Sequence, residues 1–459
     1  MVEGLGAVDW SALRNHGGYG DQVPVLLREV GTSRAAGEEL LDLLIHGEFD
    51  VTEAAAAAWP FLLELVTCEE TPRREWILSE LCAAIALNGG GGGHDVHPSW
   101  HVAWEAAKPA LLALLGSPDL CRPALHVLSR GRGDSAPVLP ALSRLWAAET
   151  DRVTRLSVVF TAAEFAGHGD VAAVDWLAAL RVPEDEPEAA MLVSAAARPD
   201  AAVLVRGLNA DLRPFYELFE MNYADLLAHL RWLLGDDPAE LTGLWLALLQ
   251  HPSWRTEALD GLLTAVRTWR SAEPRVRPLL AGWLADPDPR SRRFAVEVAG
   301  GLRAAEHADA VAELLTDGTE ISARHRIGDV AAWALARCGR PAPATTWPPP
   351  DRQGYRDYDP ATLSLDETFP PKRMRAWYEH WRRTGEVGEL ERLALAEVER
   401  WRGRALGEDG ITAVRHLVEL GVRVPRRDEL LASDHRLGGG GSWQGFDEGE
   451  DVRGLLERS

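Results

Sequence analysis

The stretch "LLAGWLADPDPRSRRFAVEV", residues 279–298, decides which fold class the sequence predicts. Apolar residues recur at intervals of three and four on both sides of a turn that contains two Asp-Pro steps. Asp288 followed by Pro289 is typical of a helix N-cap and the first helical position after it. The stretch therefore predicts the end of one helix, a short turn and a second amphipathic helix. Each helix has one apolar face, so we expect it to pack against its neighbours in the sequence.

The same arrangement returns elsewhere in the chain, and it resembles the HEAT repeat. Further copies are "LLREVGTSRAAGEELLDLL" (26–44), "LLALLGSPDLCRPALHVL" (111–128) and "LALLQHPSWRTEALDGLL" (246–263). In that repeat, two antiparallel helices bury a shared apolar face only when neighbouring pairs stack. The closest likeness is residues 286–302, where Arg292 stands at the usual basic position and Ala295 on the buried side. The resemblance implies an all-α fold, a right-handed α-solenoid of stacked antiparallel helix pairs.

The N-terminal segment, residues 12–65, is similar to the opening of a group of bacterial HEAT-repeat proteins from high-GC genomes. The matching positions are Tyr19-Gly20, Asp21, Pro24, His46-Gly47 and Pro60-Phe61-Leu62. The chain departs from the group's pattern at "HGEF", where Gly47 directly follows His46. By the repeat pattern the likeness covers about residues 1–340, and it implies an architecture without an established activity.

The sequence predicts four regions. Residues 1–339 form the HEAT-like solenoid, with a flexible glycine- and histidine-rich loop at 88–98. Residues 340–371, rich in proline and aromatic residues, form an extended linker or a strap along the solenoid. Residues 372–437 form a C-terminal helical extension, and residues 438–459 form a flexible acidic tail.

Composition narrows the classes of partner and compartment. The 459 residues carry a net charge of −22, which disfavours binding to nucleic acid and to anionic membranes. No apolar run reaches the 18 residues of a membrane span, and the N-terminus lacks the features of a secretory signal. The four cysteines are far apart and have no zinc spacing. We expect a cytoplasmic protein without a cofactor.

The stretch "NGGGGGHDVHPSWH", residues 88–101, raises the question of a metal site at His94, His97 and His101. Two histidines four residues apart on a helix can reach one zinc ion. However, Pro98 and Ser99 indicate a helix start between them, and the glycine run cannot preorganise a site because each glycine loses much entropy on ordering. We favour an insertion between repeats, with no metal.

The densest aromatic segment, residues 213–234, is the candidate contact surface for a ligand or partner. Its candidate residues are Phe215, Tyr216, Glu217, Phe219, Glu220 and Tyr223. Aromatic anchors concentrate binding energy at interfaces. His46 is a further candidate for partner contact, although at the expected end of a helix it also suits a structural role beside Gly47.

Three functions follow as hypotheses. The first is an interaction scaffold that binds a basic or amphipathic protein or peptide on its concave face. The second is an enzyme or small-molecule-binding protein of a specialised peptide or metabolite pathway, marked by an aromatic pocket near residues 213–234 with a buried carboxylate or histidine. No catalytic signature supports an enzyme, so we favour the scaffold.

The third hypothesis is a helical-repeat protein that binds nucleic acid, which would need a basic stripe. The basic and aromatic segment "PKRMRAWYEHWRR", residues 371–383, superficially suits single-stranded nucleic acid. In so acidic a chain we expect its cations to pair with the protein's own carboxylates instead.

Overall fold

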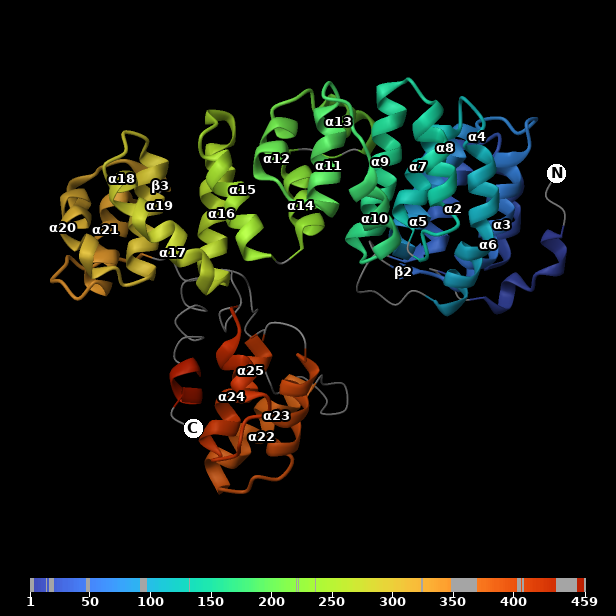
Figure 1. Cartoon of the computed structure of the whole chain (residues 1–459). Helices are drawn as coiled ribbons and strands as arrows, with labels where there is room; N and C mark the ends of the chain where they lie inside the picture. Colours follow the sequence, from blue (N-terminus) through green and yellow to red (C-terminus); the bar gives the residue numbers. More distant parts are fainter. Residues whose placement is uncertain are drawn as a thin grey trace. The chain divides into compact units, whose positions relative to one another are not determined.

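A computed structural model describes most of the chain. The described residues are 4–13, 15, 20–46, 50–90, 97–131, 133–219, 221, 223–235, 237–322, 325–347, 370–402, 406, 408–434 and 452–457. The protein is largely helical and forms two compact units, residues 1–240 and 241–459 (Figure 1). Among the helices of these ranges, none combines the length and apolar character that a bilayer crossing requires.

Unit 1, residues 1–240, is built from helices of mostly 7–17 residues. Its α-helices are α1 (Val23–Glu29), α2 (Arg34–Leu44), α3 (Glu53–Thr67), α4 (Arg74–Trp76), α5 (Ala83–Gly90), α6 (Pro98–Leu114), α7 (Cys121–Arg130), α8 (Leu139–Ala148), α9 (Arg152–Gly167), α10 (Val171–Ala179), α11 (Pro187–Ala197), α12 (Ala201–Leu208), α13 (Arg213–Phe219) and α14 (Tyr223–Leu234). Short 3-10 turns are η1 (Leu5–Ala7), η2 (Trp10–Ala12) and η3 (Gly20–Gln22), and η4 (Ile77–Cys82) is a π-helix. Strands β1 (Ile45–His46) and β2 (Asp50–Val51) form a two-stranded antiparallel pair.

The helices of unit 1 pack in sequential pairs, as expected of a helical repeat. Helix α5 packs against α7, α7 against α9, α9 against α11, and α11 against α14 (Figure 1). The intervening helices α8, α10 and α12 pack against members of this row. Helix α9 has neighbours on several sides, and every residue from 156 to 166 is buried. The predicted all-α fold of paired helices is confirmed at this level.

Tryptophans supply much of the packing near the start of unit 1. Trp59 of α3 and Trp100 and Trp104 of α6 are all buried. Their ring centroids lie 5.0–6.1 Å apart, with Trp59 edge-on to Trp100. Such tilted and edge contacts are favourable for aromatic rings, so these tryptophans act as core residues.

Two local expectations are corrected in unit 1. Helix α2 ends at Leu44, and His46 lies in β1 opposite Asp50 instead of closing the helix. The reason is that Thr52 closes the helix end from outside, since its hydroxyl and its N–H both donate to the Leu44 carbonyl. Helix α5 extends to Gly90, and α6 starts at Pro98, so the helices reach further into the glycine-rich stretch than expected.

Unit 2 comprises residues 241–459, and the residue boundary between the units falls inside α15 (Pro238–Leu248). Its further α-helices are α16 (Arg255–Thr268), α17 (Glu273–Val276), α18 (Leu280–Leu284), α19 (Pro289–Gly301), α20 (Ala308–Glu313), α21 (Ile327–Arg337), α22 (Pro370–Thr384), α23 (Leu390–Arg400), α24 (Glu408–Glu419) and α25 (Arg427–Ala432). Its 3-10 turns are η5 (Pro252–Trp254), η6 (Arg270–Ala272), η7 (Arg277–Leu279), η8 (Ala305–His307) and η9 (Leu314–Thr316). Strands β3 (Glu320–Ser322) and β4 (His325–Arg326) form a second antiparallel pair.

The stretch from which the fold class was predicted forms the pair α18 and α19. Asp288 caps α19, since its carboxylate accepts a hydrogen bond from the Arg290 N–H at 3.0 Å. Arg255 of α16 reaches the same turn, where its Nε lies 3.1 Å from Asp288 Oδ2. Arg292 donates to the Asp286 carbonyl at 2.9 Å and pairs with Asp317 at 2.9 Å. The Asp-Pro turn is therefore held by arginines from both sides, and α19 packs against α16, α18 and α21.

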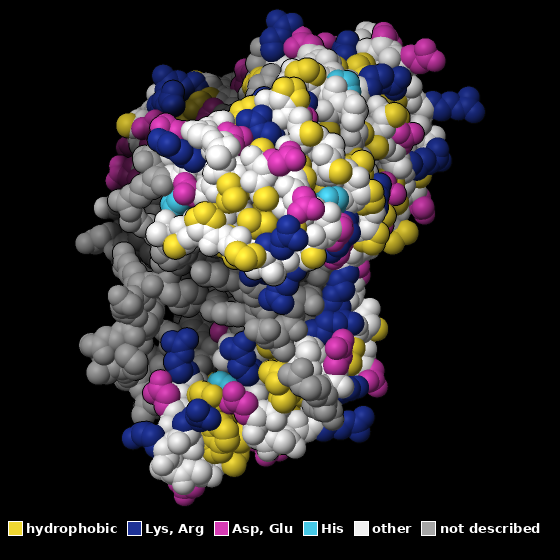
Figure 2. All heavy atoms as spheres, turned by 90° about the vertical axis from the view of Figure 1, so that its left-hand side faces the viewer, with side chains coloured by type: hydrophobic (Ala, Val, Ile, Leu, Met, Phe, Trp, Pro, Cys, Tyr) yellow, Lys and Arg dark blue, Asp and Glu magenta, His cyan; other side chains and the backbone are white. Residues whose placement is uncertain are grey.

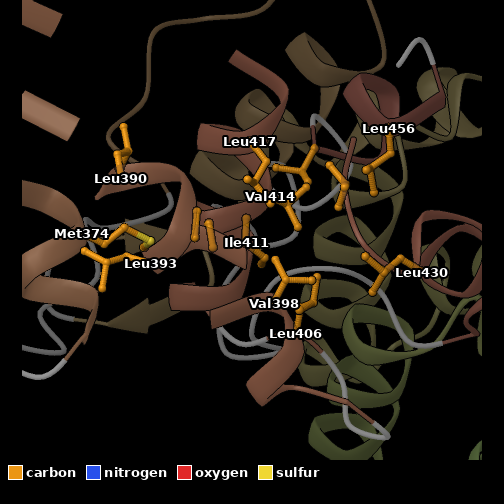
Figure 3. Packing of buried hydrophobic residues seen from close by; sticks show 14 residues of the cluster. Met374, Leu390, Leu393, Val398, Leu406, Ile411, Val414, Leu417, Leu430 and Leu456 are labelled. Atoms are coloured by element: carbon orange, nitrogen blue, oxygen red, sulfur yellow. The ribbon is translucent and has the colours of Figure 1, made fainter. Parts of the chain in front are cut away.

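The C-terminal helices α22 to α25 share a separate hydrophobic core. Figure 3 shows its side chains converging from several helices. The labelled residues are Met374, Leu390, Leu393, Val398, Leu406, Ile411, Val414, Leu417, Leu430 and Leu456. Residues 452–457, in the expected flexible tail, are helical, and Val452 and Leu456 are fully buried in this core. This part of the tail is therefore packed. The other predicted region boundaries remain predictions.

Candidate functional site

The most unusual side-chain pair in unit 1 is a buried carboxyl beside a buried imidazole. Glu164 lies on α9 and His229 on α14, and each is only 9% exposed. The Oε1 atom of Glu164 lies 3.4 Å from Nδ1 of His229. Phe160, one helical turn before Glu164, stacks on the imidazole with ring centroids 5.1 Å apart and an interplanar angle of 23°. The packing of α9 against α14 thus fixes the orientation of the histidine ring.

Burial shifts both acid–base groups in the direction of the neutral form. It raises the pKa of Glu164 from 4.5 to about 7, against the opposing effect of the positive charge of Arg130. It lowers the pKa of His229 from 6.5 to about 4, and Arg130 adds to that lowering. Between these two values the contact joins a neutral carboxylic acid to a neutral imidazole, so it is not an ion pair there.

Further titratable and aromatic groups surround this pair. His126 and Arg130 lie one turn apart on α7. Burial lowers the pKa of His126 to about 4, and the positive charge of Arg130 adds to that lowering. His168, the C-cap of α9, lies edge-on to the ring of Trp232 at 5.0 Å. The Trp232 ring centroid is 5.5 Å from that of His229, and Trp232 is 37% exposed. Helices α7, α9 and α14 thus place these groups together. We call this set the α9 site: His126, Arg130, Phe160, Glu164, His168, His229 and Trp232.

Because Gly167 has no side chain, it leaves space for the ring of Trp232. A Cβ atom on Gly167 would come within 2.4 Å of the Trp232 ring. The indole therefore lies directly against the backbone at the end of α9. Any larger residue at 167 would displace the ring from this end of the site.

The α9 site has the parts of an acid–base pair. Nε2 of His229 is buried and has no hydrogen-bond partner among the described residues. When Glu164 is ionised, the imidazole proton belongs on Nδ1, facing the carboxylate, and Nε2 is an acceptor. When Glu164 is protonated, its O–H can donate to Nδ1, and Nε2 carries the proton instead. The protonation state of Glu164 therefore decides whether Nε2 accepts or donates a hydrogen bond.

A small cavity lies between α9, α11 and α13. Its volume is about 30 Å³, and its lining residues are Arg152, Val153, Leu156, Glu186, Glu188, Ala189 and Pro214. Glu188 is 2% exposed, and Arg152 donates to its Oε2 atom. The Oε1 atom of Glu188 is buried without a hydrogen-bond partner among the described residues. This space suits one or two water molecules and is too small for a metabolite.

Unit 2 has a larger and more open hollow. Its volume is about 410 Å³, and its lining residues are Leu246, Leu249, Gln250, Arg255, Leu279 and Trp283. Leu279, at the end of η7, is 39% exposed. The hollow is therefore partly apolar and faces solvent, which suits shallow contacts more than an enclosed substrate.

The structure separates the candidate contact residues of the aromatic segment. Phe215 on α13 is fully buried among core residues, whereas Tyr216 beside it is half-buried. Glu220 lies outside the described residues, as do the side chains of Glu217, Phe219, Tyr223 and His46. That these residues contact a partner stays a prediction.

Of the three histidines considered for a metal site, the structure describes two, His97 and His101. His97 is the N-cap of α6, where its Nδ1 atom lies 2.7 Å from the Ser99 hydroxyl. His101 is exposed on that helix, and His94 lies outside the described residues. Within the described ranges, no three His, Cys, Asp or Glu residues are grouped so that they could hold a metal ion.

Sequence reasoning named neither Glu164 nor His229 as a site residue, although a signal existed for both. Glu164 interrupts the small and apolar helix segment "FTAAEFAG" (160–167), and His229 interrupts "LLAHLRWLL" (226–234). A polar residue on an apolar helix face needs a buried partner. The partners lie 65 residues apart in the chain, so the pairing is visible only in the packed helices.

Comparisons with known proteins do not assign the chain to a family. No family model matches the sequence. No curated protein matches it either. Among solved structures, the chain is similar to the crystal structure of an engineered protein from the Northeast Structural Genomics Consortium, at 14% identity over 95% of this chain and 99% of that one. The TM-score is 0.31, which is too low to support an argument about fold or function.

Proposed function

We propose that the protein is an interaction scaffold that binds a protein or peptide. In this proposal its helix pairs belong to a right-handed HEAT-like α-solenoid, and the partner lies along the concave face. The row of α5, α7, α9, α11 and α14 supports the proposal, because stacked helix pairs create extended binding surfaces. The net charge of −22 favours a basic or amphipathic partner.

The observation that carries the proposal is the exposed aromatic ring of Trp232 at the α9 site. The ring is 37% exposed, yet one side lies against Gly167 and its neighbours are His168 and His229. A tryptophan already fixed by packing loses little entropy on binding, which is typical of anchor residues at interfaces. We therefore place partner contact at Trp232.

A peptide library displayed on phage and selected against the full-length protein tests this function. We expect enrichment of peptides with basic and apolar residues. Fluorescence anisotropy with a labelled enriched peptide should show at least about tenfold weaker binding to Trp232→Ala, as for interface anchors. Val171→Ala is the matched control, since Val171 is also exposed in unit 1, at 70%. No enrichment, or an equal loss in both variants, would remove the proposal.

The Glu164–His229 pair favours a second candidate, a small-molecule-binding protein or enzyme. Buried groups with shifted pKa values concentrate at functional sites. A ligand that presents an N–H or O–H group would satisfy the Nε2 atom of His229 when Glu164 is ionised. A fragment screen by ligand-observed NMR on wild type and His229→Phe tests this candidate. It fails if no fragment loses binding in the variant.

A further inference from the structure

Helix α22 carries a concentration of positive charge that contrasts with the rest of the chain. Residues 370–384 contain five Lys and Arg residues and one acidic residue. The wider segment 370–432 contains 13 Lys and Arg against 11 Asp and Glu, although the whole chain has 48 against 70. The acidic character of the protein is therefore concentrated outside its C-terminal helices.

The packing of α22 leaves its arginines exposed on one side. Met374 is buried in the C-terminal core, and Trp377, Tyr378 and Trp381 pack against that core. Arg375 and Arg382, seven residues apart, lie on the same exposed stripe of the helix. Figure 2 shows Lys and Arg side chains among hydrophobic and acidic ones on the described surface of the C-terminal helices.

The expected pairing of these arginines with the protein's own carboxylates holds only in part. Arg373 lies 3.3 Å from Glu389. Among the residues that the structure describes, no carboxylate lies at ion-pair distance from Arg375, Arg382 or Arg383. Two of these cations, Arg375 and Arg382, share the stripe and are accessible to an external anion.

Helix α24 adds a further cation beside Tyr378. The imidazole of His416 stacks on the Tyr378 ring at 3.8 Å, and the Tyr378 hydroxyl donates to Glu419 at 2.7 Å. The pKa of this hydroxyl is raised by burial and by Glu419, while the charges of Arg382 and Arg415 act in the opposite direction. Arg415 directly precedes His416 on α24 and is half-buried. We name Arg375, Tyr378, Arg382 and Arg415 the α22 surface.

We infer that the α22 surface binds an acidic peptide segment of a partner protein. Charge complementarity supports the occupant, because exposed arginines orient and hold carboxylates. This partner differs from the basic one proposed for the α9 site, and the inference does not depend on that proposal.

Two observations favour an acidic peptide over single-stranded nucleic acid. Base stacking needs open aromatic ring faces. Here a face of Tyr378 is occupied by His416, and the ring of Trp377 lies against Gly388, whose added Cβ would meet it at 2.1 Å. A long polyanion would also be repelled by the acidic remainder of the chain, whereas a short acidic segment is repelled less.

Fluorescence anisotropy with the full-length protein tests the inference. The probes are fluorescein-labelled peptides of twelve glutamates or twelve lysines, and a labelled twelve-nucleotide oligothymidine, at 20 and at 150 mM NaCl. We expect saturable binding of the glutamate peptide that weakens with salt, as screening requires. Weaker or absent binding of the oligothymidine supports a protein partner. Tighter binding of the oligothymidine would overturn the inference in favour of nucleic acid.

Charge-reversal substitutions test whether the glutamate peptide binds at the α22 surface. The double variant Arg375→Glu/Arg382→Glu should bind the glutamate peptide at least about tenfold more weakly than wild type, as for paired charges at an interface. Arg181→Glu with Arg206→Glu is the control, because both of these arginines are exposed in unit 1 and the net charge changes equally. An equal loss in both proteins overturns the inference. If the reversed protein has an altered circular dichroism spectrum, Arg375→Gln with Arg382→Gln replaces it and should give a smaller loss in the same direction.

The chain's own acidic tail is the competing occupant. A variant in which Asp447, Glu448, Glu450 and Asp451 become Asn or Gln keeps the buried residues at 452 and 456. Unchanged affinity for the glutamate peptide supports an external partner. A clear gain of affinity would show that the tail occupies the α22 surface and would overturn the inference.

Discussion

Nδ1 of His229 and Oε1 of Glu164 lie 3.4 Å apart inside unit 1, and near pH 6 neither group is charged. This contact connects α9 to α14 through two residues that lose most of their hydration on folding. Because desolvation disfavours the charged forms, the folded state and the unfolded state bind different numbers of protons at these residues. The stability of unit 1 should therefore depend on pH in a way that single substitutions can separate.

Glu164→Gln should remove a loss of stability at alkaline pH. The folded pKa of Glu164 is about 7 against an ordinary value of 4.5, so between these values the folded state binds more protons than the unfolded state. The free energy of unfolding therefore falls as pH rises through this window. Relative to wild type, the variant should gain up to about 3 kcal/mol between pH 5 and pH 8.

Urea denaturation at pH 5 and pH 8 measures this difference. Glu29→Gln on the exposed side of α1 is the control and should change the pH dependence little. Parallel pH profiles of wild type and Glu164→Gln would contradict a protonated Glu164 in the folded state.

Histidine substitutions should reduce the loss of stability in acid. The pKa values of His229 and His416 are both lowered to about 4, chiefly by burial. Between pH 4 and 6.5 the unfolded state binds more protons at these residues than the folded state does. The free energy of unfolding is therefore highest above about pH 6.5 and decreases as the pH falls through this window. Each histidine contributes up to about 3 kcal/mol to this loss. His229→Gln should make the acid loss of stability smaller for unit 1, where His126 keeps its own contribution, and His416→Gln should make it smaller for unit 2. Thermal melts from pH 4 to 7 measure both.

Gly131→Ala should destabilise unit 1 by overpacking. A Cβ atom at Gly131 would meet the ring of buried Trp104 at 1.6 Å, so the indole must move. Inserting a methyl group into such a core costs about 1–3 kcal/mol. Gly282→Ala on α18 is the matched control, since no atom lies within 4 Å of its added Cβ. The control should gain about 0.5–1 kcal/mol from helix propensity, as measured by urea denaturation. A Gly131→Ala protein as stable as wild type would argue against this packing of α6 on α7.

Asp170→Ala should cost more stability than Asp200→Ala. Both aspartates cap a helix, α10 and α12 respectively. Asp170 also accepts a hydrogen bond from the Ser135 N–H at 2.9 Å, which ties α10 to the segment before α8. Loss of a cap costs about 1 kcal/mol, and loss of the second hydrogen bond adds about 1 kcal/mol. The midpoints of urea denaturation should rank wild type, Asp200→Ala and Asp170→Ala from highest to lowest. Equal values for the two variants would mean that the Ser135 contact is dispensable.

Short-range features of the fold were predictable from the sequence. Asp288 before Pro289 marked the start of α19, because capping depends on residues within one turn. The end of α2 was not predictable in the same way, since Thr52 closes it from eight residues away. Likewise, nothing in the acidic composition of residues 438–459 shows that Val452 and Leu456 enter the core formed by α22 to α25.

For the candidate site, the sequence indicated the type of residue and its approximate place in the chain, but not its partners. His229, which lies in the segment 213–234, is buried, whereas the aromatic pocket expected around such a residue stays a prediction. Its partner Glu164 and the cation Arg130 come from helices far earlier in the chain, and the sequence carries no signal for their distance. Aromatic density within residues 213–234 also did not predict which of its aromatic side chains are exposed. Phe215 is fully buried, whereas Trp232 is partly open to solvent.

The enclosure of α9 has a consequence for how unit 1 opens. Residues 156–166 touch neighbours all around the helix, so their amide hydrogens reach solvent only when several surrounding helices separate together. In hydrogen–deuterium exchange, these amides should be the slowest of unit 1. A partner or ligand seated at the α9 site would slow them further, so deuterium uptake at the centre of the unit would register occupancy at its surface.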